Sequence, residues 1–331
     1  EGIPFAQVFG ENYLSVLPGE FDIIFKTPVV RYDLPVLLEA AARGAVVTSE
    51  MELFLSLCPA KVYGVTGSDG KTTTTTLIYK ILSEQCAKRG GKVWVGGNIG
   101  TPLLQFTDEM RSEDKVVVEL SSFQLMHMQC KLDVSVVTNV TPNHLDVHKS
   151  YEEYIEAKKN VFLGSGPENV AVLNADNPVT SEFGCEAPGE VRFFSIRHAV
   201  KNGAYLDGTK IMLARNGACR CLMERSDILL PGDHNVENYL AAICAVGEDA
   251  EDADILFVAR TFGGVEHRLE FVRNFEGVDY YNSSIDSSPN RTIHALGVFP
   301  EKVILLAGGK DKKIPYDALG PVLADKVKVL I

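Results

Sequence analysis

The sequence has little of what a secreted, membrane-spanning or nucleic-acid-binding protein needs. Its 32 Lys and Arg residues are outnumbered by 44 Asp and Glu residues, which gives a net charge of -12. Such a surface repels nucleic acid and anionic membranes, so neither is expected as a main partner. The chain shows no signal-peptide pattern and no apolar run of membrane-spanning length. We therefore expect a cytoplasmic protein without membrane insertion, and a monomer.

The chain also lacks a CxxC pair. Its seven cysteines are scattered, and an odd number without close pairs suits reduced thiols better than a disulfide framework. Cys219 and Cys221 in "ACRCLM" are the closest pair, and alternate residues of a strand point the same way. A metal or redox role stays open for them, but plain strand packing is the favoured interpretation.

Both ends of the chain are unusual. It begins at Glu1 without a methionine and stops at Ile331 inside "KVKVLI", which has the pattern of a buried strand. These two features lead us to expect a fragment of a longer protein.

What the sequence does contain is a repeated order of strand, glycine loop and helix. With 331 residues and 46% hydrophobic composition, it can build two or three domains. The order predicts an α/β fold with mostly parallel sheets, divided into a partial unit at 1–59, a central unit at 60–263 and a partial unit at 264–331. Strands are predicted at 21–27, 44–49, 61–67, 92–97, 115–120, 132–140, 169–176, 277–284 and 302–309, with short alternating strands between 191 and 232 and helices at 33–44 and 235–247.

The stretch "KVYGVTGSDGKTT" predicts a phosphate-binding loop between a strand and a helix. Backbone N–H groups near Gly67 and Gly70 would hold phosphates, Lys71 would neutralise the terminal one, and Thr72 would bind Mg²⁺. Val65 departs from the general GxxxxGK[ST] pattern, so the loop is of a shorter GxxGKT kind. The alternative is a glycine-rich turn without a nucleotide. The residues expected at the nucleotide from this loop are Gly67, Ser68, Asp69, Gly70, Lys71, Thr72 and Thr73.

Two later strands end in polar residues that could serve the same site. Glu119 closes the apolar strand of "KVVVEL", and Asn139, His144 and Asp146 follow the next one. Open α/β sheets bind ligands at the carboxyl ends of their strands, where a carboxylate can hold a phosphate-bound magnesium. The alternatives are that Glu119 caps a helix and that His144 is a surface loop residue.

Two segments predicted to be helical carry pairs of polar side chains whose role the local sequence does not decide. On local sequence alone, Lys158 and Lys159 in "YIEAKKNVF" are interpreted as part of a solvated helix face. Asn235 and Asn238 lie three apart, so both amides share one face of the predicted helix. They could contact a base, although Asn235 could equally be the N-cap.

Seven motifs occur in an order that resembles one enzyme family, the Mur ligases of peptidoglycan synthesis. They are "TGSDGKTT", "GGNIGTPLL", "ELSSFQL", "NHLDVH" followed by "YIEAKK", "GDHNVENYLAA", "HRLE" and "GGKDKK". The resemblance covers nearly the whole chain. It implies a three-domain architecture, with a central P-loop ATPase-like domain of mostly parallel sheet plus a small antiparallel sheet, flanked by partial Rossmann-like domains. "GGNIG" with "ELSSFQL" looks most like the member that adds D-glutamate.

The resemblance also implies a role for individual residues. Lys71 would act at the ATP phosphates, and Thr72, Glu119, His144 and Lys158 would serve Mg²⁺, Lys158 as a carbamylated lysine. The catalytic set would be Lys71, Glu119, His144 and Lys158. The remaining implied contacts are Asn235 and Asn238 at adenine, Arg268 near the phosphates, Asn98, Ser121 and Gln124 near the nucleotide-sugar substrate, and Lys312 near the incoming amino acid.

Two positions depart from the family pattern. Ser283 in "NSSIDSSPNRT" stands where an aspartate near the ATP ribose is usual, and Asp286 could replace it. Val29 in "KTPVV" stands where a uridine-side loop usually has glycine. The family's first glycine-rich loop and much of its amino-acid-binding domain would lie outside this sequence.

The resemblance implies a reaction. ATP would phosphorylate the carboxylate of UDP-N-acetylmuramoyl-L-alanine, and the amine of D-glutamate would displace phosphate from the acyl phosphate to form an amide. Domain closure would be needed to align the groups and exclude water. The alternatives are a sister ligase for another amino acid, including folate polyglutamation, a plain or motor ATPase, and a non-catalytic scaffold.

Overall fold

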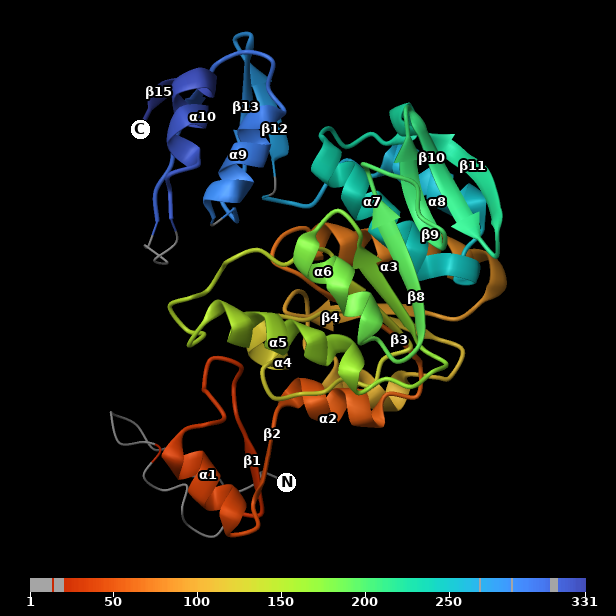
Figure 1. Cartoon of the computed structure of the whole chain (residues 1–331), viewed down its shortest axis with the longest axis vertical. Coiled ribbons are helices and arrows are strands. Elements are labelled where there is room, and N and C mark those ends of the chain that lie inside the picture. The colour runs from red at the N-terminus through yellow and green to blue at the C-terminus, as the bar shows by residue number, and fades with distance from the viewer. Residues whose placement is uncertain (1–13, 15–20, 268, 287, 310–314) are drawn as a thin grey trace.

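The computed structural model describes residues 14, 21–267, 269–286, 288–309 and 315–331. Figure 1 shows a large central sheet with its helices, a small α/β unit around α1 at one end and a second small unit around α9 at the other. Within the described ranges, none of the helices combines the length and apolar character needed to cross a lipid bilayer.

The central sheet has nine strands in the order β11-β10-β9-β8-β7-β6-β3-β5-β4. Strands β4 to β9 pair in parallel around β3, and β9, β10 and β11 pair antiparallel as a continuation of the same sheet. The strands are β3 (Lys61–Thr66), β4 (Val93–Gly97), β5 (Lys115–Glu119), β6 (Val134–Val137), β7 (Val170–Asn174), β8 (Glu190–Ser195), β9 (Gly203–Asp207), β10 (Lys210–Arg215) and β11 (Ala218–Glu224).

Helices cover both faces of this sheet, because alternate residues of its strands point to opposite sides and both sides are apolar. Tyr63 and Val65 belong to the core beneath α3, α7 and α8, whereas Val62 belongs to the core beneath α2, α4 and α5. The helices are α2 (Glu50–Leu57), α3 (Lys71–Arg89), α4 (Ser122–Leu125), α5 (Tyr151–Leu163), α6 (Pro178–Glu182), α7 (Asp233–Val246) and α8 (Asp252–Thr261), with short 3₁₀ turns η2 (Leu104–Glu109), η3 (Phe183–Cys185), η4 (Arg225–Asp227) and η5 (Gly247–Asp249).

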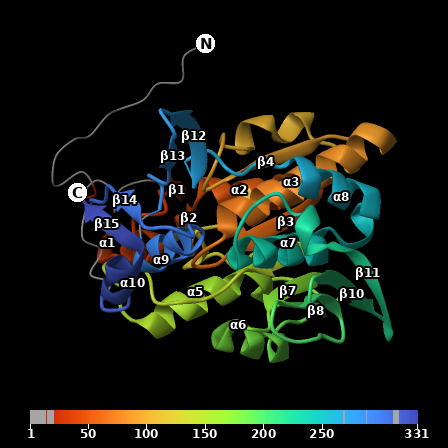
Figure 2. The ribbon, with the colours of Figure 1, turned by 90° about the horizontal axis from the view of Figure 1, so that it is seen from above.

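The two flanking units are smaller α/β pieces. The first pairs β1 (Ile23–Phe25) with β2 (Val46–Thr48) in parallel beside α1 (Pro35–Ala42). The second contains the hairpin β12 (Glu270–Phe275) and β13 (Val278–Asn282), α9 (Pro289–Gly297), and the parallel pair β14 (Val303–Leu305) and β15 (Val327–Leu330) with α10 (Leu319–Lys326). Seen from above, α9 lies between β12–β13 and α10 (Figure 2).

The predicted α/β order is confirmed, with differences at the ends of elements. The predicted strand at 132–140 is shorter, since pairing ends at Val137 where the chain turns toward the glycine loop. The alternating strands end at Glu224, and η4 with an irregular segment follows. The predicted helix at 235–247 begins two residues earlier, at Asp233.

Candidate active site

The phosphate loop has the predicted form of a strand, a glycine turn and a helix. Gly67 and Gly70 have φ of 147° and 81°, and a Cβ at Gly70 would lie 2.3 Å from Asn238 Oδ1. Only glycine tolerates both demands. Gly70 is the N-cap of α3, so the first-turn amides of a 19-residue helix face the loop. Lys71 Nζ donates to the carbonyls of Gly67 at 2.9 Å and Ser68 at 3.1 Å. This arrangement of helix amides beside an ammonium is suited to holding an anion.

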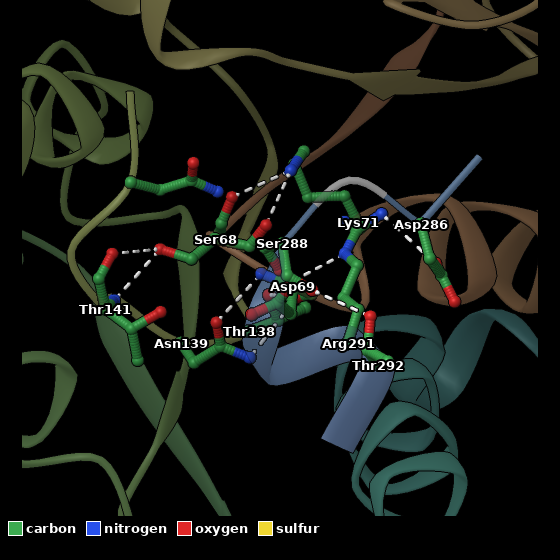
Figure 3. Close-up of polar contacts among 12 residues, drawn as sticks. Ser68, Asp69, Lys71, Thr138, Asn139, Thr141, Asp286, Ser288, Arg291 and Thr292 are labelled. Carbon is green, nitrogen blue, oxygen red and sulfur yellow. Dashed lines mark hydrogen bonds and ion pairs between the residues drawn. The ribbon is translucent and has the colours of Figure 1, made fainter. Parts of the chain in front are cut away.

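The end of β6 holds the loop in place (Figure 3). Asn139 Oδ1 accepts from the Asp69 N–H at 2.9 Å, and Asn139 Nδ2 donates to the Asp69 carbonyl at 3.2 Å. The Ser68 hydroxyl donates to the Thr141 carbonyl at 2.9 Å and lies 2.9 Å from Tyr154 Oη. The Ser68 side chain and the Asp69 backbone are therefore committed to protein contacts, which leaves the N-terminal end of α3 for an anion.

Glu119 is placed as predicted, at the carboxyl end of β5, and is only 2% exposed. Its Oε1 accepts from Asn98 Nδ2 at 2.8 Å, whereas Oε2 is buried and has no hydrogen-bond partner in the described part of the chain. The helix-cap alternative is wrong, because Ser121 caps α4 in a capping box with Gln124. A buried carboxylate oxygen without a donor is costly unless a ligand or cation completes it.

Lys158 is almost completely buried, at 1% exposed, so the local interpretation of a solvated face is wrong for it. Its Nζ donates to the Gly67 carbonyl at 2.8 Å. Burial, with the positive charge of Lys71, lowers the pKa of Lys158 far below its usual range, against the opposing charges of Asp69 and Glu119. Helix periodicity separates the neighbours: Lys159 pairs with Glu156 and Glu186 at the surface.

His144 lies in the loop between β6 and α5, half-buried, with a left-handed φ of 55°. Its ring packs edge-on against Phe123, with centroids 5.0 Å apart, so it lies beside the short helix that follows Glu119. The conformation is fixed by the His144 carbonyl, which accepts from Val147 N at 3.1 Å and His148 N at 3.0 Å. Asp146, from the same loop, is exposed.

Asn235 and Asn238 lie on one buried face of α7, as predicted. Asn238 Nδ2 donates to Asn235 Oδ1 at 3.3 Å, and Thr74 Oγ1 donates to Asn238 Oδ1 at 3.3 Å, which ties α7 to the phosphate-loop helix. The N-cap alternative for Asn235 is wrong, because Gly232 occupies that position. Both asparagines line a cavity of about 330 Å³, and Asp69, Gly70 and Thr73 also line it. It is large enough for part of a nucleotide.

The other predicted site residues are found in several different places. Ser121 and Gln124 bond to each other in the capping box of α4, and Asn98 bonds to Glu119. Asp286 lines the cavity, and its Oδ2 accepts from Ser283 Oγ at 2.6 Å. Val29 lies in an exposed turn. Arg268 and Lys312 lie outside the described residues, and their roles remain predictions.

Sequence reasoning missed the side chains that the cavity gathers from distant segments. Glu237 on α7, Arg197 after β8 and Arg291 on α9 all line it. Burial, with the carboxylates of Asp176 and Asp233, raises the pKa of Glu237 to about 7 against the pull of Arg197. Glu237 sits between the two asparagines in "HNVEN", which is the one local signal that could have found it.

The predicted magnesium residues fit a cation only in part by geometry. In the ranges described, no three His, Cys, Asp or Glu side chains converge as a metal site. Mg²⁺ does not require such a cage, since it is commonly held by one or two carboxylates together with phosphates and water. The unpaired Oε2 of Glu119 beside a phosphate loop is the observation that fits the ion.

Comparison with known proteins identifies the family. A model of the Mur ligase middle domain matches residues 65–246. The chain belongs to the Mur ligase family. It is 53% identical to the UDP-N-acetylmuramoylalanine--D-glutamate ligase of Ruminiclostridium cellulolyticum and 55% identical to that of Acetivibrio thermocellus. Each comparison covers 100% of this chain and 70% of the relative.

Solved Mur ligases share the fold of this Mur ligase. MurF from Acinetobacter baumannii superposes with a TM-score of 0.62 at 16% identity, over 93% of this chain and 80% of that one. MurF from Thermotoga maritima, solved in complex with ADP, gives a TM-score of 0.60 at 21% identity, over 89% of this chain and 81% of that one. The predicted fold class and family are confirmed.

Proposed function

We propose that this Mur ligase joins D-glutamate to UDP-N-acetylmuramoyl-L-alanine and converts ATP to ADP and phosphate in the same reaction. The observation that carries the proposal is the identity of 53–55% over the whole chain to ligases named for that reaction. The site supports it with a loop suited to an anion, a buried carboxylate of which one oxygen has no donor in the described part of the chain, and a buried lysine.

The first step is transfer of the γ-phosphoryl group of ATP to the acceptor carboxylate, which forms an acyl phosphate and ADP. Both reactants are anions, so their approach needs positive charge. Lys71 and the first turn of α3 supply it from the protein. Mg²⁺ held by Thr72, Glu119, His144 and a modified Lys158 would supply the rest of the charge neutralisation.

The second step forms the amide. The amine of D-glutamate attacks the acyl carbon, the carbon–oxygen bond to phosphate breaks, and the amine loses a proton. A dry site protects the acyl phosphate from water, so closure of the flanking units over the cavity is part of the proposal. The units at 1–59 and 264–331 are proposed as partial acceptor-binding and amino-acid-binding domains. A cytoplasmic, monomeric enzyme suits substrates that are ATP and a nucleotide-linked sugar.

The environment of Lys158 suits carbamylation. Only a neutral amine attacks carbon dioxide, and the lowered pKa of Lys158 provides one. The neutral amine and carbon dioxide form a new nitrogen–carbon bond, which gives a carbamate, a carboxylate on a long stem, and releases one proton. Lys159 is the natural control, because its ion pairs with Glu186 and Glu156 outweigh burial and raise its pKa. When the protein is labelled with ¹³C-bicarbonate, the NMR signal of the carbamate carbon should be absent in Lys158→Gln and present in Lys159→Gln.

Phosphate release tests the reaction itself. The full-length protein is assayed with ATP, Mg²⁺ and UDP-N-acetylmuramoyl-L-alanine, and D-glutamate is compared with L-glutamate, L-alanine and L-lysine. Release that depends on D-glutamate is expected. Release without any amino acid would indicate a plain ATPase, and release with a different amino acid would indicate a sister ligase.

A further inference from the structure

The phosphate loop carries an acidic side chain at its tip. Asp69 lies between Ser68 and Gly70, and its backbone is fixed by Asn139 on one side and by Thr138 Oγ1, which donates to the Asp69 carbonyl at 2.5 Å. The carboxylate cannot swing away with the backbone. It lines the same cavity as Gly70 and Thr73. A fixed negative charge here opposes the binding of a polyphosphate.

Arg291 meets this charge from another part of the molecule. Its Nε donates to Asp69 Oδ1 at 2.6 Å, across 222 residues of sequence. The pair is largely withdrawn from solvent, with side-chain exposures of 14% for Arg291 and 22% for Asp69. Figure 3 shows the guanidinium of Arg291 between Asp69 and Asp286. Partial burial makes this pair stronger than an exposed one.

Arg291 is itself anchored in the unit that contains α9. Its guanidinium lies 3.6 Å from Asp286 Oδ1, and Asp286 accepts from Ser283. A second contact joins the same helix to the central domain, because the rings of His294 on α9 and His234 on α7 lie 5.7 Å apart. The position of Arg291 over the loop therefore depends on how this unit docks.

We propose that Arg291 is a positioning residue that cancels the charge of Asp69 when the α9 unit is docked, so that docking tightens nucleotide binding and undocking weakens it. This inference rests on the proposed ATP-dependent function. Without Arg291, the Asp69 carboxylate faces the incoming phosphates uncompensated. Opening of the α9 unit after the reaction thus promotes release of ADP.

The proposal differs from direct phosphate binding by Arg291 in one measurable respect. If Arg291 only neutralises Asp69, its removal does no harm once Asp69 is already neutral. If it binds phosphate, its removal weakens binding whether or not Asp69 is charged. A double-mutant cycle separates the two.

The experiment is calorimetric titration of the full-length protein with MgATP and with MgADP. Arg291→Ala should weaken binding about tenfold, as expected for one unpaired charge near the phosphates at an effective dielectric constant near 20. Asp69→Asn serves as the reference of the cycle, and Asp69→Asn/Arg291→Ala should bind as tightly as Asp69→Asn alone. The loss in Arg291→Ala should shrink with added KCl, and Arg291→Lys should retain most of the affinity.

A matched control is Arg220→Ala, which breaks an exposed pair with Asp252 on the central domain and should leave binding unchanged. A double variant as weak as Arg291→Ala overturns the proposal in favour of direct phosphate binding. Unchanged binding by Arg291→Ala overturns it altogether. Failure of the unmodified protein to bind MgATP would instead refute the proposed function, and circular dichroism verifies that each variant is folded.

Discussion

The two edges of the central sheet both contain buried charges, but they treat them differently. At the amino ends of the strands, Asp249 accepts from Tyr63 Oη and from Lys61 Nζ at 2.6 Å, with Lys115 Nζ 3.6 Å away. Asp114, 4% exposed, accepts from Trp94 Nε1 at 3.1 Å and from two backbone amides. The carboxylates of Asp249 and Asp114 both have hydrogen-bond donors.

At the carboxyl ends, groups are left incomplete. Lys158 is buried with Lys71 as a neighbouring like charge, and one oxygen of Glu119 has no donor. Four buried side-chain atoms lack a hydrogen-bond partner in the described ranges. They are Glu119 Oε2 at the end of β5, His148 Nδ1 in the loop after β6, Thr75 Oγ1 on α3 and Ser288 Oγ at the N-cap of α9. Buried polar atoms without hydrogen-bond partners at one edge of the sheet indicate where a bound ligand would supply those partners.

The largest effect is expected at Lys71. Lys71→Ala removes the ammonium beside the phosphates and should lower kcat by about 10³-fold, with little change in the free energy of unfolding. Steady-state phosphate release is the measurement. Lys61→Met at the opposite edge is the matched control, and it should change stability but leave kcat within about twofold. Equal losses of kcat in both variants would abolish the distinction between the edges.

Glu119 should come next. Glu119→Gln keeps the shape but removes the charge that would face the cation, so kcat should fall about 10²-fold and half-saturation should need more Mg²⁺. The Mg²⁺ dependence of phosphate release reports this. Asp114→Asn changes the same kind of residue at the other edge and should not move the Mg²⁺ requirement. An unchanged requirement in Glu119→Gln would remove Glu119 from the metal site.

At the amino edge the expected loss is one of stability. Asp249→Ala leaves Lys61 and Tyr63 without their acceptor, so the free energy of unfolding should fall by about 2 kcal/mol. Urea denaturation followed by circular dichroism measures it. The folded fraction should retain its kcat. A drop in kcat without a drop in stability would show that this edge also takes part in the reaction.

The smallest effect concerns Glu237, whose pKa is raised to about 7 from 4.5. Because the folded pKa is raised, the stabilising contribution is complete below pH 4.5 and is lost as the pH rises through 7. Thermal unfolding should therefore show that Glu237→Gln is more stable than the unmodified protein at pH 8, by about 1 kcal/mol in the free energy of unfolding after solvent screening, and equally stable near pH 4.5. A difference that does not depend on pH would contradict this assignment.

The sequence was sufficient for the local parts of the site. The seven predicted phosphate-site residues, Gly67–Thr73, run consecutively from the end of β3 into the first turn of α3. Their two glycines mark the positions where the backbone needs a positive φ. Glu119 was found because an apolar strand ends at it. The α/β order followed from the same alternation, and only the lengths of elements differed, as at Asp233.

The sequence was insufficient where a side chain's role depends on what packs against it. Nothing local in "EAKKN" shows that Lys158 is fully buried whereas Lys159 is half-buried and paired with Glu156 and Glu186. The family resemblance gave Lys158 its different role. Local sequence could not decide whether Asn235 is the N-cap of its helix, because nothing in it marks Gly232 as the N-cap. The pair between Asp69 and Arg291 joins two units of the chain, so no window of sequence contains it.

The place of α7 in the chain also bears on protein synthesis. This helix is buried from Val236 to Val246, and it follows every strand of the nine-stranded sheet. A nascent chain that has not yet emerged past residue 233 has only α3 to cover this face of the sheet and has neither Asn235 nor Asn238. Emergence of α7 therefore extends the cover of this face of the core and supplies Asn235 and Asn238 at the same stage of synthesis.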